Sequence, residues 1–464
     1  LVAMSDTIAH RGPDGSGIWV SDDQSVGFSH RRLAIVDLSA EANQPMTDSE
    51  KTTIVTFNGE IYNHLDLRNQ LLALGHNFST DHSDTEVLIH GYKQWGLKAL
   101  VNRLDGMFAF GLWDNLKKTL VLARDRIGIK PLYFCSHNGS FRFASEIKSI
   151  LTDPSIPREM DQNALNHYLS FMVSPPPLTQ FKGIYKLPAA HTLTVCDDGT
   201  LRANRYWELS SNNDEILEIS KLPPEEQEFH FVRGVRSRLE SAVEKRLMSD
   251  VSFGVFLSGG IDSSVNVALM SQMMSRSVDT FTVGFKDFTH LNELNFAKQI
   301  SNKFKTNHHE ILIDEKDVLT YLNELIHYQD EPIADWVCLP LHFLSNLAKR
   351  VGRKVVQVGE GSDEQFCGYE SWLRYLKAKK YFWDPYKYLC PNGFMSAIDK
   401  MGIGFAPASR GTASQILEML HRASTGHELF FSGANSIWEI HKPKYLNYSN
   451  YTETQDYNYL EKAG

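Results

Sequence analysis

A buried strand that runs into a glycine- and serine-rich loop and then into a helix most constrains how this chain can fold. The strand is predicted over 253–257 (FGVFL), the loop over 258–264 (SGGIDSS) and the helix over 261–274. Further helices are predicted over 232–248 and 291–303, and further strands over 280–285, 310–313 and 355–358. Helices that alternate with short buried strands at this spacing predict a parallel sheet with crossover helices, which is an α/β fold.

The loop has the composition of a phosphate-binding site. Free N–H groups and the dipole at a helix N-terminus attract anions, and Gly259 and Gly260 have no Cβ atoms to keep phosphate oxygens from the backbone. Hydroxyl donors are available from Ser258, Ser263 and Ser264. The carboxylate of Asp262 suits this position if it holds Mg²⁺. No GxxxxGKS or GxxxxGKT loop occurs, so this is not a Walker loop, and an ordinary strand-to-helix turn is the alternative.

A second glycine-containing loop, GEGSDE from Gly359 to Glu364, follows the predicted strand over 355–358. Open α/β sheets bind ligands at the carboxyl ends of their strands, which is where this loop is expected. Its three carboxylates suit a metal or a developing cation, and a solvated acidic turn is the alternative. A third acidic turn, Asp330-Glu331-Pro332, allows the same two interpretations.

The first two hundred residues have a different pattern. Strands are predicted over 54–57, 107–113, 119–123 and 132–134, and helices over 64–74 and 85–95, the second beginning in a capping box over 83–86. This order predicts a layered α/β or α+β domain. The stretch Ser174-Pro175-Pro176-Pro177 predicts a stiff connection, and the polar stretch with Pro223-Pro224 predicts a linker. We therefore expect domains over 1–208 and 229–464, joined by a linker over 209–228.

Charge and cysteine content exclude several classes of protein. Lys and Arg total 47 against 56 Asp and Glu, which disfavours a nucleic-acid binder, since such proteins depend on clustered cations. No apolar run reaches the ~18–20 residues of a membrane helix, and no signal peptide is recognised at Leu1. The five cysteines are scattered and form no CxxC pair, which predicts reduced thiols in a cytoplasmic protein. His308-His309-Glu310 is interpreted as a strand-edge histidine pair, not a metal site, because neighbouring strand residues face opposite ways.

Several motifs occur together and in order: RGPDGSG, HRRLAIVD, FNGEIYN and SDTE, followed by SGGIDSS and GEGSDE. In this order, from about Ala9 to about Tyr369, the chain resembles the glutamine-dependent asparagine synthetases. The resemblance implies a class II glutamine amidotransferase domain with the four-layer αββα fold of N-terminal-nucleophile hydrolases. It also implies a second domain with the parallel-sheet fold of ATP pyrophosphatases (adenine nucleotide α-hydrolase-like), in which ATP activates a carboxylate.

The resemblance also assigns site residues. For glutamine, Arg32 would clamp the α-carboxylate, Asn58 and Gly59 would form the oxyanion hole, and Glu60 and Asp84 would hold the amine. Glu360 is assigned a catalytic role, and Asp262 and Asp363 would hold Mg²⁺. The residues expected to bind ATP are Leu257, Ser258, Gly259, Gly260, Asp262, Ser263, Ser264, Val283, Gly359 and Glu360. A plain turn at Asn58-Gly59, a helix cap at Asp84 and a surface cation at Arg32 are the alternatives for those residues.

The chain departs from the family pattern in three places. The family's nucleophile is a cysteine at the mature N-terminus, but no cysteine occurs before Cys135. Either a short leading segment precedes Leu1 or the glutaminase is inactive, and we favour the first. The family's Arg-x-Pro-Phe-Leu-Asp stretch and a later lysine do not occur before Gly464, so we expect the second domain to be C-terminally incomplete. Val358 lies where the family often has serine.

The leading hypothesis is therefore a two-domain amidotransferase that uses glutamine, ATP and Mg²⁺ to convert a carboxylate into an amide, with aspartate as the default acceptor. One alternative acceptor is a uronic acid of a surface polysaccharide, suggested by residues that are atypical of asparagine synthetases: Trp336, Cys338, Gln365 and Cys367. An alternative of another class is a non-catalytic nucleotide-binding module. Small molecules are the expected partners, without nucleic acid or membrane, and a homodimer is left open. Ammonia is expected to pass between the halves through an apolar interface.

Overall fold

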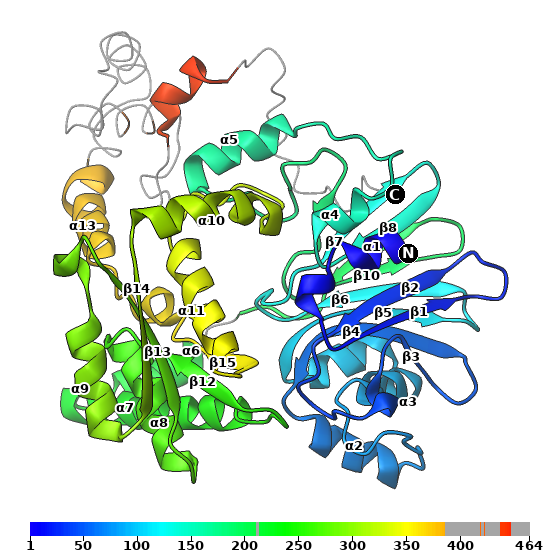
Figure 1. The fold of residues 1–464 in the computed structure, drawn as a ribbon, viewed down its shortest axis with the longest axis horizontal. Coiled ribbons are helices and arrows are strands. Elements are labelled where there is room, and N and C mark those ends of the chain that lie inside the picture. The colour runs from blue at the N-terminus through cyan, green and yellow to red at the C-terminus, as the bar shows by residue number, and fades with distance from the viewer. Residues whose placement is uncertain (210–212, 386–417, 419–421, 423–436, 447–464) are drawn as a thin grey trace.

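The protein consists of two parts that lie side by side (Figure 1). The computed structural model describes residues 1–209, 213–385, 418, 422 and 437–446. The N-terminal part, residues 1–209, contains the antiparallel strands, and the C-terminal part, from residue 213 onward, contains the parallel ones. The tyrosines at 448, 451, 457 and 459 and Cys390 fall outside the described residues.

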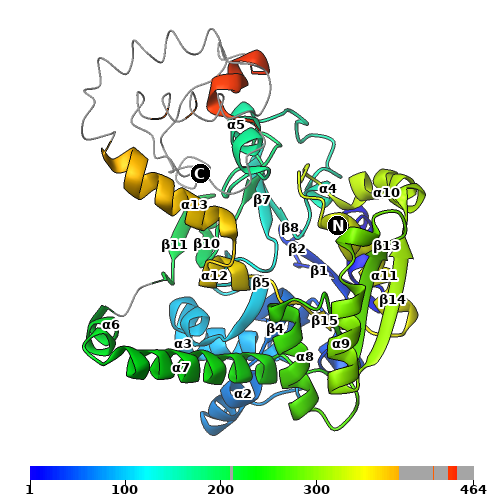
Figure 2. The same ribbon diagram turned by 90° about the vertical axis from the view of Figure 1, so that its left-hand side faces the viewer.

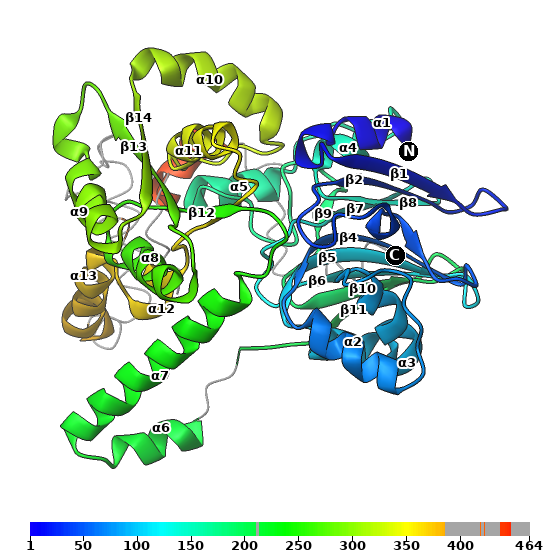
Figure 3. The same cartoon turned by 60° about the horizontal axis from the view of Figure 1, so that its bottom comes forward.

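The N-terminal part is built in four layers, helix, sheet, sheet and helix (Figure 3). One layer is a six-stranded antiparallel sheet in the order β11 (Leu201–Arg205), β10 (His191–Val195), β6 (Thr119–Arg124), β5 (Gly106–Asp114), β4 (Thr53–Ile61) and β3 (Met46–Thr47). The facing layer contains two separate sheets: β1 (Gly15–Val20) with β2 (Gly27–Arg32), and β8 (Ser140–Ala144) with β7 (Tyr133–His137) and β9 (Tyr185–Lys186). The predicted four-layer αββα fold is confirmed.

Helices cover both outer faces of this sandwich. The six-stranded sheet is covered by α2 (His64–Ala73) and α3 (Glu86–Arg103), and the facing layer by α1 (Val2–Asp6) and α4 (Ile147–Ile150). One apolar core lies between the two long helices and the six-stranded sheet, and a second lies between the sheets. The remaining elements of this part are α5 (Gln162–Phe171), η1 (Ala9–Arg11) and η2 (Ala40–Ala42).

Two local predictions for the N-terminal part are wrong. The strand predicted to end at Phe57 continues as β4 to Ile61, because Asn58, Gly59 and Glu60 pair with β5; a plain turn at these positions is therefore excluded. The capping box over 83–86 is absent: the Glu86 carboxylate instead accepts the N–H groups of Ser79 (2.7 Å) and Thr80 (2.8 Å). The helix predicted over 85–95 bends at Gly96, where φ is 72°, and then continues to Arg103.

The C-terminal part contains the predicted parallel sheet, in the order β14 (Asn307–Ile313), β13 (Asp279–Phe285), β12 (Phe253–Phe256) and β15 (Val355–Gln357). The helices between and beside these strands are α8 (Ile261–Met273), α9 (Leu294–Phe304), α10 (Glu315–Tyr328) and α11 (Cys338–Arg350), with η3 (Thr289–Leu291). A core of Val255, Leu257, Val267 and Met270 lies between the central strand and α8. The α/β prediction is therefore confirmed.

The stretch predicted as a linker over 209–228 contains helical segments where the structure describes it. It contains α6 (Asn213–Ser220) and the beginning of α7 (Pro224–Lys245), which extend away from the rest of the molecule (Figures 2 and 3). Pro224 begins α7 because proline lacks an N–H group that the first helical turn does not need. The other elements are α12 (Ser362–Phe366), α13 (Glu370–Ala378), η4 (Lys379–Trp383) and η5 (Glu439–Lys444). No helix within the described residues is long and apolar enough to cross a membrane.

Candidate functional site

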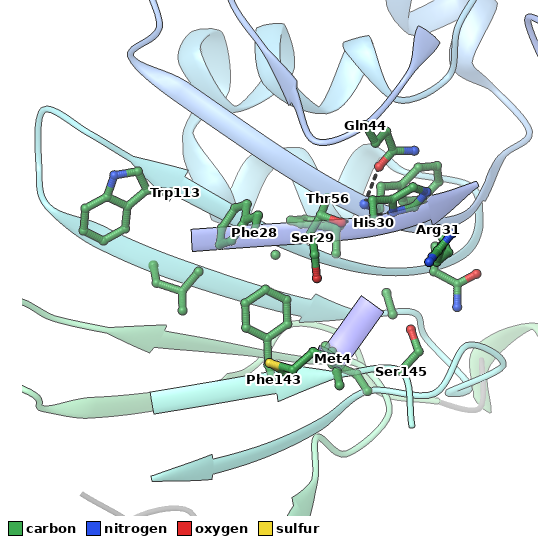
Figure 4. A pocket seen from close by; sticks show the side chains of 18 of the residues that line it. Met4, Phe28, Ser29, His30, Arg31, Gln44, Thr56, Trp113, Phe143 and Ser145 are labelled. Atoms are coloured by element: carbon green, nitrogen blue, oxygen red, sulfur yellow. Dashed lines mark hydrogen bonds between the residues drawn. The ribbon is translucent and has the colours of Figure 1, made fainter. Parts of the chain in front are cut away.

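The N-terminal part contains a cavity of about 720 Å³ between its two strand layers, which we call the sandwich cavity (Figure 4). All five residues predicted to bind glutamine line it, although they are spread over more than fifty positions in the sequence: Arg32, Asn58, Gly59, Glu60 and Asp84. The first comes from the end of β2, the next three from β4 and the last from the loop before α3. The fold therefore brings the predicted residues together.

Asn58 has the clearest chemical signature in the cavity. Its Nδ2 atom is buried and has no hydrogen-bond partner. An unpaired buried donor costs about 1–3 kcal/mol, so its presence indicates a site at which an acceptor is expected. Gly59 is also constrained sterically: a Cβ atom there would lie 2.2 Å from the Met107 carbonyl oxygen of β5. Glycine is therefore required at this position by the close approach of two strands.

Two buried carboxylates lie next to Asn58 and Gly59. Asp84 Oδ2 accepts the N–H of Ile61 (3.0 Å), which brings Asp84 beside Glu60 on β4. Burial raises the pKa of Asp84 to about 7, and the negative charge of Glu60 adds to the rise. Burial also raises the pKa of Glu60, opposed by the positive charges of Lys130 and Arg246. A pair of desolvated carboxylates favours a bound cation, such as an amino-acid ammonium group.

Arg32 is buried and already holds the loop that follows β2. Its guanidinium donates to the carbonyl oxygens of Ser39 (2.8 Å) and Asp37 and to Asn43 Oδ1 (3.0 Å). Two of its five N–H groups have no such bond, so Arg32 retains donors for a carboxylate while its position is fixed. A free surface cation, the alternative interpretation, is excluded because only 8% of the residue is exposed.

The prediction missed three polar residues that shape the same cavity (Figure 4). His30 Nδ1 lies 3.1 Å from Thr56 Oγ1, and burial lowers the pKa of His30 to about 4, so the imidazole is neutral. Gln44 Oε1 accepts the N–H of Phe57 (2.7 Å) one residue before Asn58. His30 lies in the HRRLAIVD motif, and its two-residue spacing from Arg32 on a strand was the available signal.

The cavity is bounded by two strand edges. Every residue of β2 and of β8 lines the cavity. Successive residues of a strand point to opposite faces of its sheet, so the wall of the cavity is formed by the edges of these two strands. Among the strands of the described residues, β2 pairs with β1 alone and β8 with β7 alone. Phe28 and Phe143 meet across this gap with ring centroids 5.6 Å apart. Cys196, in the turn after β10, also lines the cavity. Its neighbour Val195 lies in register, across β6 and β5, with the beginning of β4, so Cys196 is at the end of the cavity away from Asn58.

The C-terminal part has a smaller cavity, of about 230 Å³, at the carboxyl ends of β12, β13 and β15; we call it the loop pocket. Eight of the ten residues predicted to bind ATP line it: Leu257, Ser258, Gly260, Asp262, Ser263, Val283, Gly359 and Glu360. A Cβ atom at Gly359 would lie 3.0 Å from Asp262 Cβ and 3.1 Å from the Ser263 nitrogen. The glycine therefore lets the GEGSDE loop approach the first turn of α8.

Hydroxyl groups organise the first turn of α8 at this pocket. Ser258 Oγ lies 3.0 Å from Ser263 Oγ and accepts the N–H of Gly260 (3.2 Å). Asp262 Oδ1 accepts the hydroxyl of Ser362 (2.8 Å), which joins the two loops. The arrangement is a helix N-terminus that carries hydroxyl donors and is closed on one side by acidic residues, as expected for a phosphate with a cation.

Two protein-family models match this chain, one over each of the parts that contain a cavity. The family model described as Glutamine amidotransferase domain matches residues 1–207, and the one described as Asparagine synthase matches residues 234–461. A putative glutamine-hydrolysing asparagine synthetase 2 of Methanocaldococcus jannaschii is 34% identical over 391 residues, which cover 80% of this chain and 72% of that protein. The chain belongs to the glutamine-hydrolysing asparagine synthetase family.

Other relatives of the family match over less of their length. The glutamine-hydrolysing asparagine synthetase 1 of Bacillus subtilis is 35% identical over 82% of this chain and 57% of its own. A protein named amidase chry2 from Gibberella zeae is 33% identical over 80% of this chain and 55% of its own. The chain thus spans less than two thirds of the length of these two relatives.

Three of the residues assigned by the family resemblance do not line the loop pocket. Gly259, at φ 89°, faces α9, where a Cβ atom would lie 2.6 Å from the Ala297 nitrogen. Ser264 Oγ is buried without a partner but is not in the pocket wall. The Asp363 carboxylate packs on Gly368 and is not in the pocket wall.

The remaining acidic residues near the pocket suit Mg²⁺ only in part. The carboxylates in its wall are Asp262, Glu293 and Glu360, and oxygen ligands are what this ion prefers. Within the described residues no group of three or more His, Cys, Asp or Glu side chains suits a metal. His308 and His309 contact different partners, Glu310 (3.1 Å) and Asp279 (3.3 Å), as the strand alternation predicts.

The interface between the two parts contains polar and apolar residues, and passage of ammonia through it stays a prediction. Ion pairs join the parts, among them Lys245 with Asp105 (2.6 Å), Lys354 with Asp14 (2.8 Å) and His82 with Asp250 (2.7 Å). Ring contacts join them as well: the rings of His10 and Tyr328 have centroids 5.2 Å apart, and the Arg246 guanidinium lies 4.8 Å from the Tyr62 ring centroid. The sandwich cavity and the loop pocket share no lining residue.

Proposed function

We propose that the sandwich cavity binds glutamine, that the loop pocket binds ATP, and that the complete protein converts aspartate into asparagine. The observation that supports this most is the convergence of Arg32, Asn58, Glu60 and Asp84 on one cavity. Together they offer a cation for a carboxylate, two carboxylates for an ammonium group and a free donor for an oxyanion. These are the groups that an α-amino acid amide requires.

On the glutamine side, the residues of this chain bind and orient the substrate. Asn58 Nδ2 would donate to the oxygen of the side-chain amide as negative charge develops on it, a contribution worth roughly 3 kcal/mol. Glu60 and Asp84 would hold the α-ammonium group and Arg32 the α-carboxylate. The family resemblance assigns the nucleophile to a cysteine at the mature N-terminus, whose own amine would act as base.

On the ATP side, the substrate carboxylate would attack the α-phosphorus, and pyrophosphate would leave with the electron pair of the broken P–O bond. Ammonia would then attack the acyl carbon, release AMP and form the amide. Ser258, Gly260 and the N-terminus of α8 would hold the phosphates, and Glu360 lies in the same wall. When bound, Mg²⁺ would neutralise phosphate charge, and Asp262 and Glu360 are the side chains that would hold it.

Aspartate remains the proposed acceptor. The four residues that favoured a uronic acid, namely Trp336, Cys338, Gln365 and Cys367, do not line the loop pocket. Three of them are exposed, and Cys338 donates to the carbonyl oxygen of Asp335 (3.0 Å). Their positions within the described residues therefore add no support for a sugar at this pocket.

The test is pyrophosphate release by the complete protein with ATP, a panel of carboxylates and either glutamine or ammonium. We expect aspartate to support release with both nitrogen sources, and glucuronate or galacturonate to support none. An Asp262→Asn variant should lose most turnover with an unchanged unfolding temperature. Release with a uronic acid alone would support the alternative acceptor. Failure to release pyrophosphate with every carboxylate, together with ATP binding, would favour a non-catalytic nucleotide-binding module.

A further inference from the structure

The acidic turn Asp330-Glu331 does not belong to either cavity. It follows α10 in the C-terminal part, yet its first carboxylate contacts the N-terminal part. Asp330 Oδ2 accepts the N–H of Ile147 (2.5 Å), and Oδ1 lies 2.9 Å from Lys148 Nζ, at the beginning of α4. The metal-binding interpretation of this turn therefore gives way to a contact between the two parts.

Glu331 makes a second, separate contact with the N-terminal part. Its Oε1 accepts the N–H of Gln180 (2.7 Å), and its Oε2 lies 2.8 Å from Lys186 Nζ. Lys186 also donates to the carbonyl oxygen of Ser174 (2.7 Å), at the start of the proline-rich connection. The Asp330 and Glu331 side chains are each only 10% exposed, so both ion pairs are largely removed from solvent.

The Asp330 contact continues toward the sandwich cavity. Lys148 pairs with the Glu146 carboxylate, and Glu146 Oε1 accepts from Arg11 Nη1 (3.0 Å). Arg11 lines the cavity. In the other direction, the chain runs from Glu331 through a short segment into α11, whose residues Leu341 and Leu344 line the loop pocket. The turn is thus connected to the sandwich cavity through side-chain contacts and to the loop pocket through the chain itself.

We propose that Asp330 and Glu331 are positioning residues. Their two contacts together fix the orientation of the C-terminal part against the N-terminal part. Two carboxylates bound to separate elements define an orientation, and they are less exposed than the other ion pairs that join the parts. Because both pairs are largely buried, removing one partner leaves an uncompensated charge and opens the contact. The inference rests on the proposed function, because a defined orientation is required only if ammonia made in one part is used in the other.

The experiment measures, in the complete protein, the ratio of amide formed to glutamine hydrolysed, alongside ammonium-dependent amide formation. In Glu331→Lys and in Lys186→Glu the ratio should fall by about tenfold, since misplacing reacting groups by ~1 Å costs on the order of a hundredfold. Ammonium-dependent synthesis should be unchanged. The double variant Glu331→Lys with Lys186→Glu should regain part of the ratio, because the ion pair is restored with opposite polarity while the bonds to the Gln180 N–H and the Ser174 carbonyl oxygen are not. The control Lys354→Glu, which removes a more exposed pair between the parts, should have no effect.

An unchanged ratio in Glu331→Lys, or no recovery in the double variant, would overturn the proposal. An equal loss of both reactions would also overturn it, because that result assigns the pair to folding alone. Hydrogen exchange separates this proposal from the proposed function: amide exchange at Ile147 should become faster in Asp330→Asn whether or not the protein makes an amide. Suppose that wild-type protein makes no amide from either nitrogen source, but Ile147 exchanges faster in Asp330→Asn than in wild type. The proposed function would then be wrong, and the proposed contact between the parts would still hold.

Discussion

The sandwich cavity and the loop pocket are built in opposite ways. In the sandwich cavity, Asn58, Gly59 and Glu60 lie inside a central strand and are fixed by its register with β5. In the loop pocket, Ser258, Gly260 and Glu360 are exposed and lie in loops after strands. The first site is therefore part of the packed core of its domain, whereas the second is formed by loops at the ends of core strands.

This difference has an energetic meaning. The sandwich cavity keeps an unpaired amide and a carboxylate whose pKa is raised to about 7, both of which make the folded state less stable without a ligand. The loop pocket satisfies its serines with one another and leaves its carboxylates close to solvent. Substitutions in the first site should therefore change stability and activity together, and those in the second should change activity alone.

The largest effect is expected from a matched pair of glycine substitutions. Gly59→Ala places a Cβ atom 2.2 Å from the Met107 carbonyl oxygen, so β4 and β5 must separate, at a cost of about 3 kcal/mol. In Gly260→Ala the nearest atom is Ser258 Oγ at 3.3 Å, so the fold should be retained while ATP binding weakens. Denaturant unfolding and ATP titration measure both. Equal losses of stability would break the contrast between the sites.

The next effect concerns the unpaired amide. Asn58→Ala should lower the rate constant of glutamine hydrolysis about 10²–10³-fold, because a donor to the oxyanion is lost. Unfolding free energy should not fall, because no existing hydrogen bond is broken. Ammonium-dependent pyrophosphate release, which uses the loop pocket, should be unchanged. Asn102→Ala, which removes an exposed helical amide, is the control. A loss of both reactions in Asn58→Ala would mean that the two sites are not separate.

A third comparison sets a buried carboxylate against a half-buried one. Because the pKa of Asp84 is raised from 3.8 to about 7, its contribution to stability is complete below about pH 4 and is lost as pH rises toward 7. Asp84→Asn should therefore stabilise the protein by on the order of 2 kcal/mol near pH 8, and less near pH 5. Asp262→Asn should leave stability unchanged at both values. Thermal unfolding at the two pH values measures this.

The same raised pKa predicts the pH dependence of binding. Protons compete with the glutamine ammonium group for Asp84, so calorimetric affinity should decrease as pH falls from about 8 to about 6. In Asp84→Asn the affinity should be low throughout. An affinity that is independent of pH would show that this carboxylate does not hold the amine.

The smallest effect is expected at the junction between the parts. The Asp250 carboxylate raises the pKa of His82 against the opposing effect of burial. This pair therefore stabilises the protein fully below about pH 6.5 and is lost as pH rises through the raised value. Since both side chains are more than a third exposed, His82→Gln should cost under about 1 kcal/mol near pH 6, and less at high salt. A larger or pH-independent change would indicate a role beyond the ion pair.

The sequence predicted the features that depend on neighbouring residues and missed those that depend on distant ones. The strand, loop and helix around SGGIDSS follow from local hydrophobic pattern and helix-terminus chemistry, and eight predicted ATP residues line one pocket. Gly259 was assigned to phosphate, but its surroundings are set by α9, more than thirty positions away. The glutamine residues could be assembled only through the family resemblance, because sheet register brings them together. Nothing near Glu331 in the sequence identifies Lys186 as its partner.

The unpaired amide of Asn58 also has a consequence for evolution. A group that lowers the stability of the resting protein is retained only while the reaction it serves is under selection. If a lineage of this family came to obtain ammonia from solution, replacements at Asn58 and Asp84 would be neutral or favourable for folding. Gly59 would still be required, because the close approach of β5 does not depend on glutamine. A relative that retains the glycine equivalent to Gly59 but has replaced Asn58 and Asp84 would therefore be expected to have lost glutaminase activity.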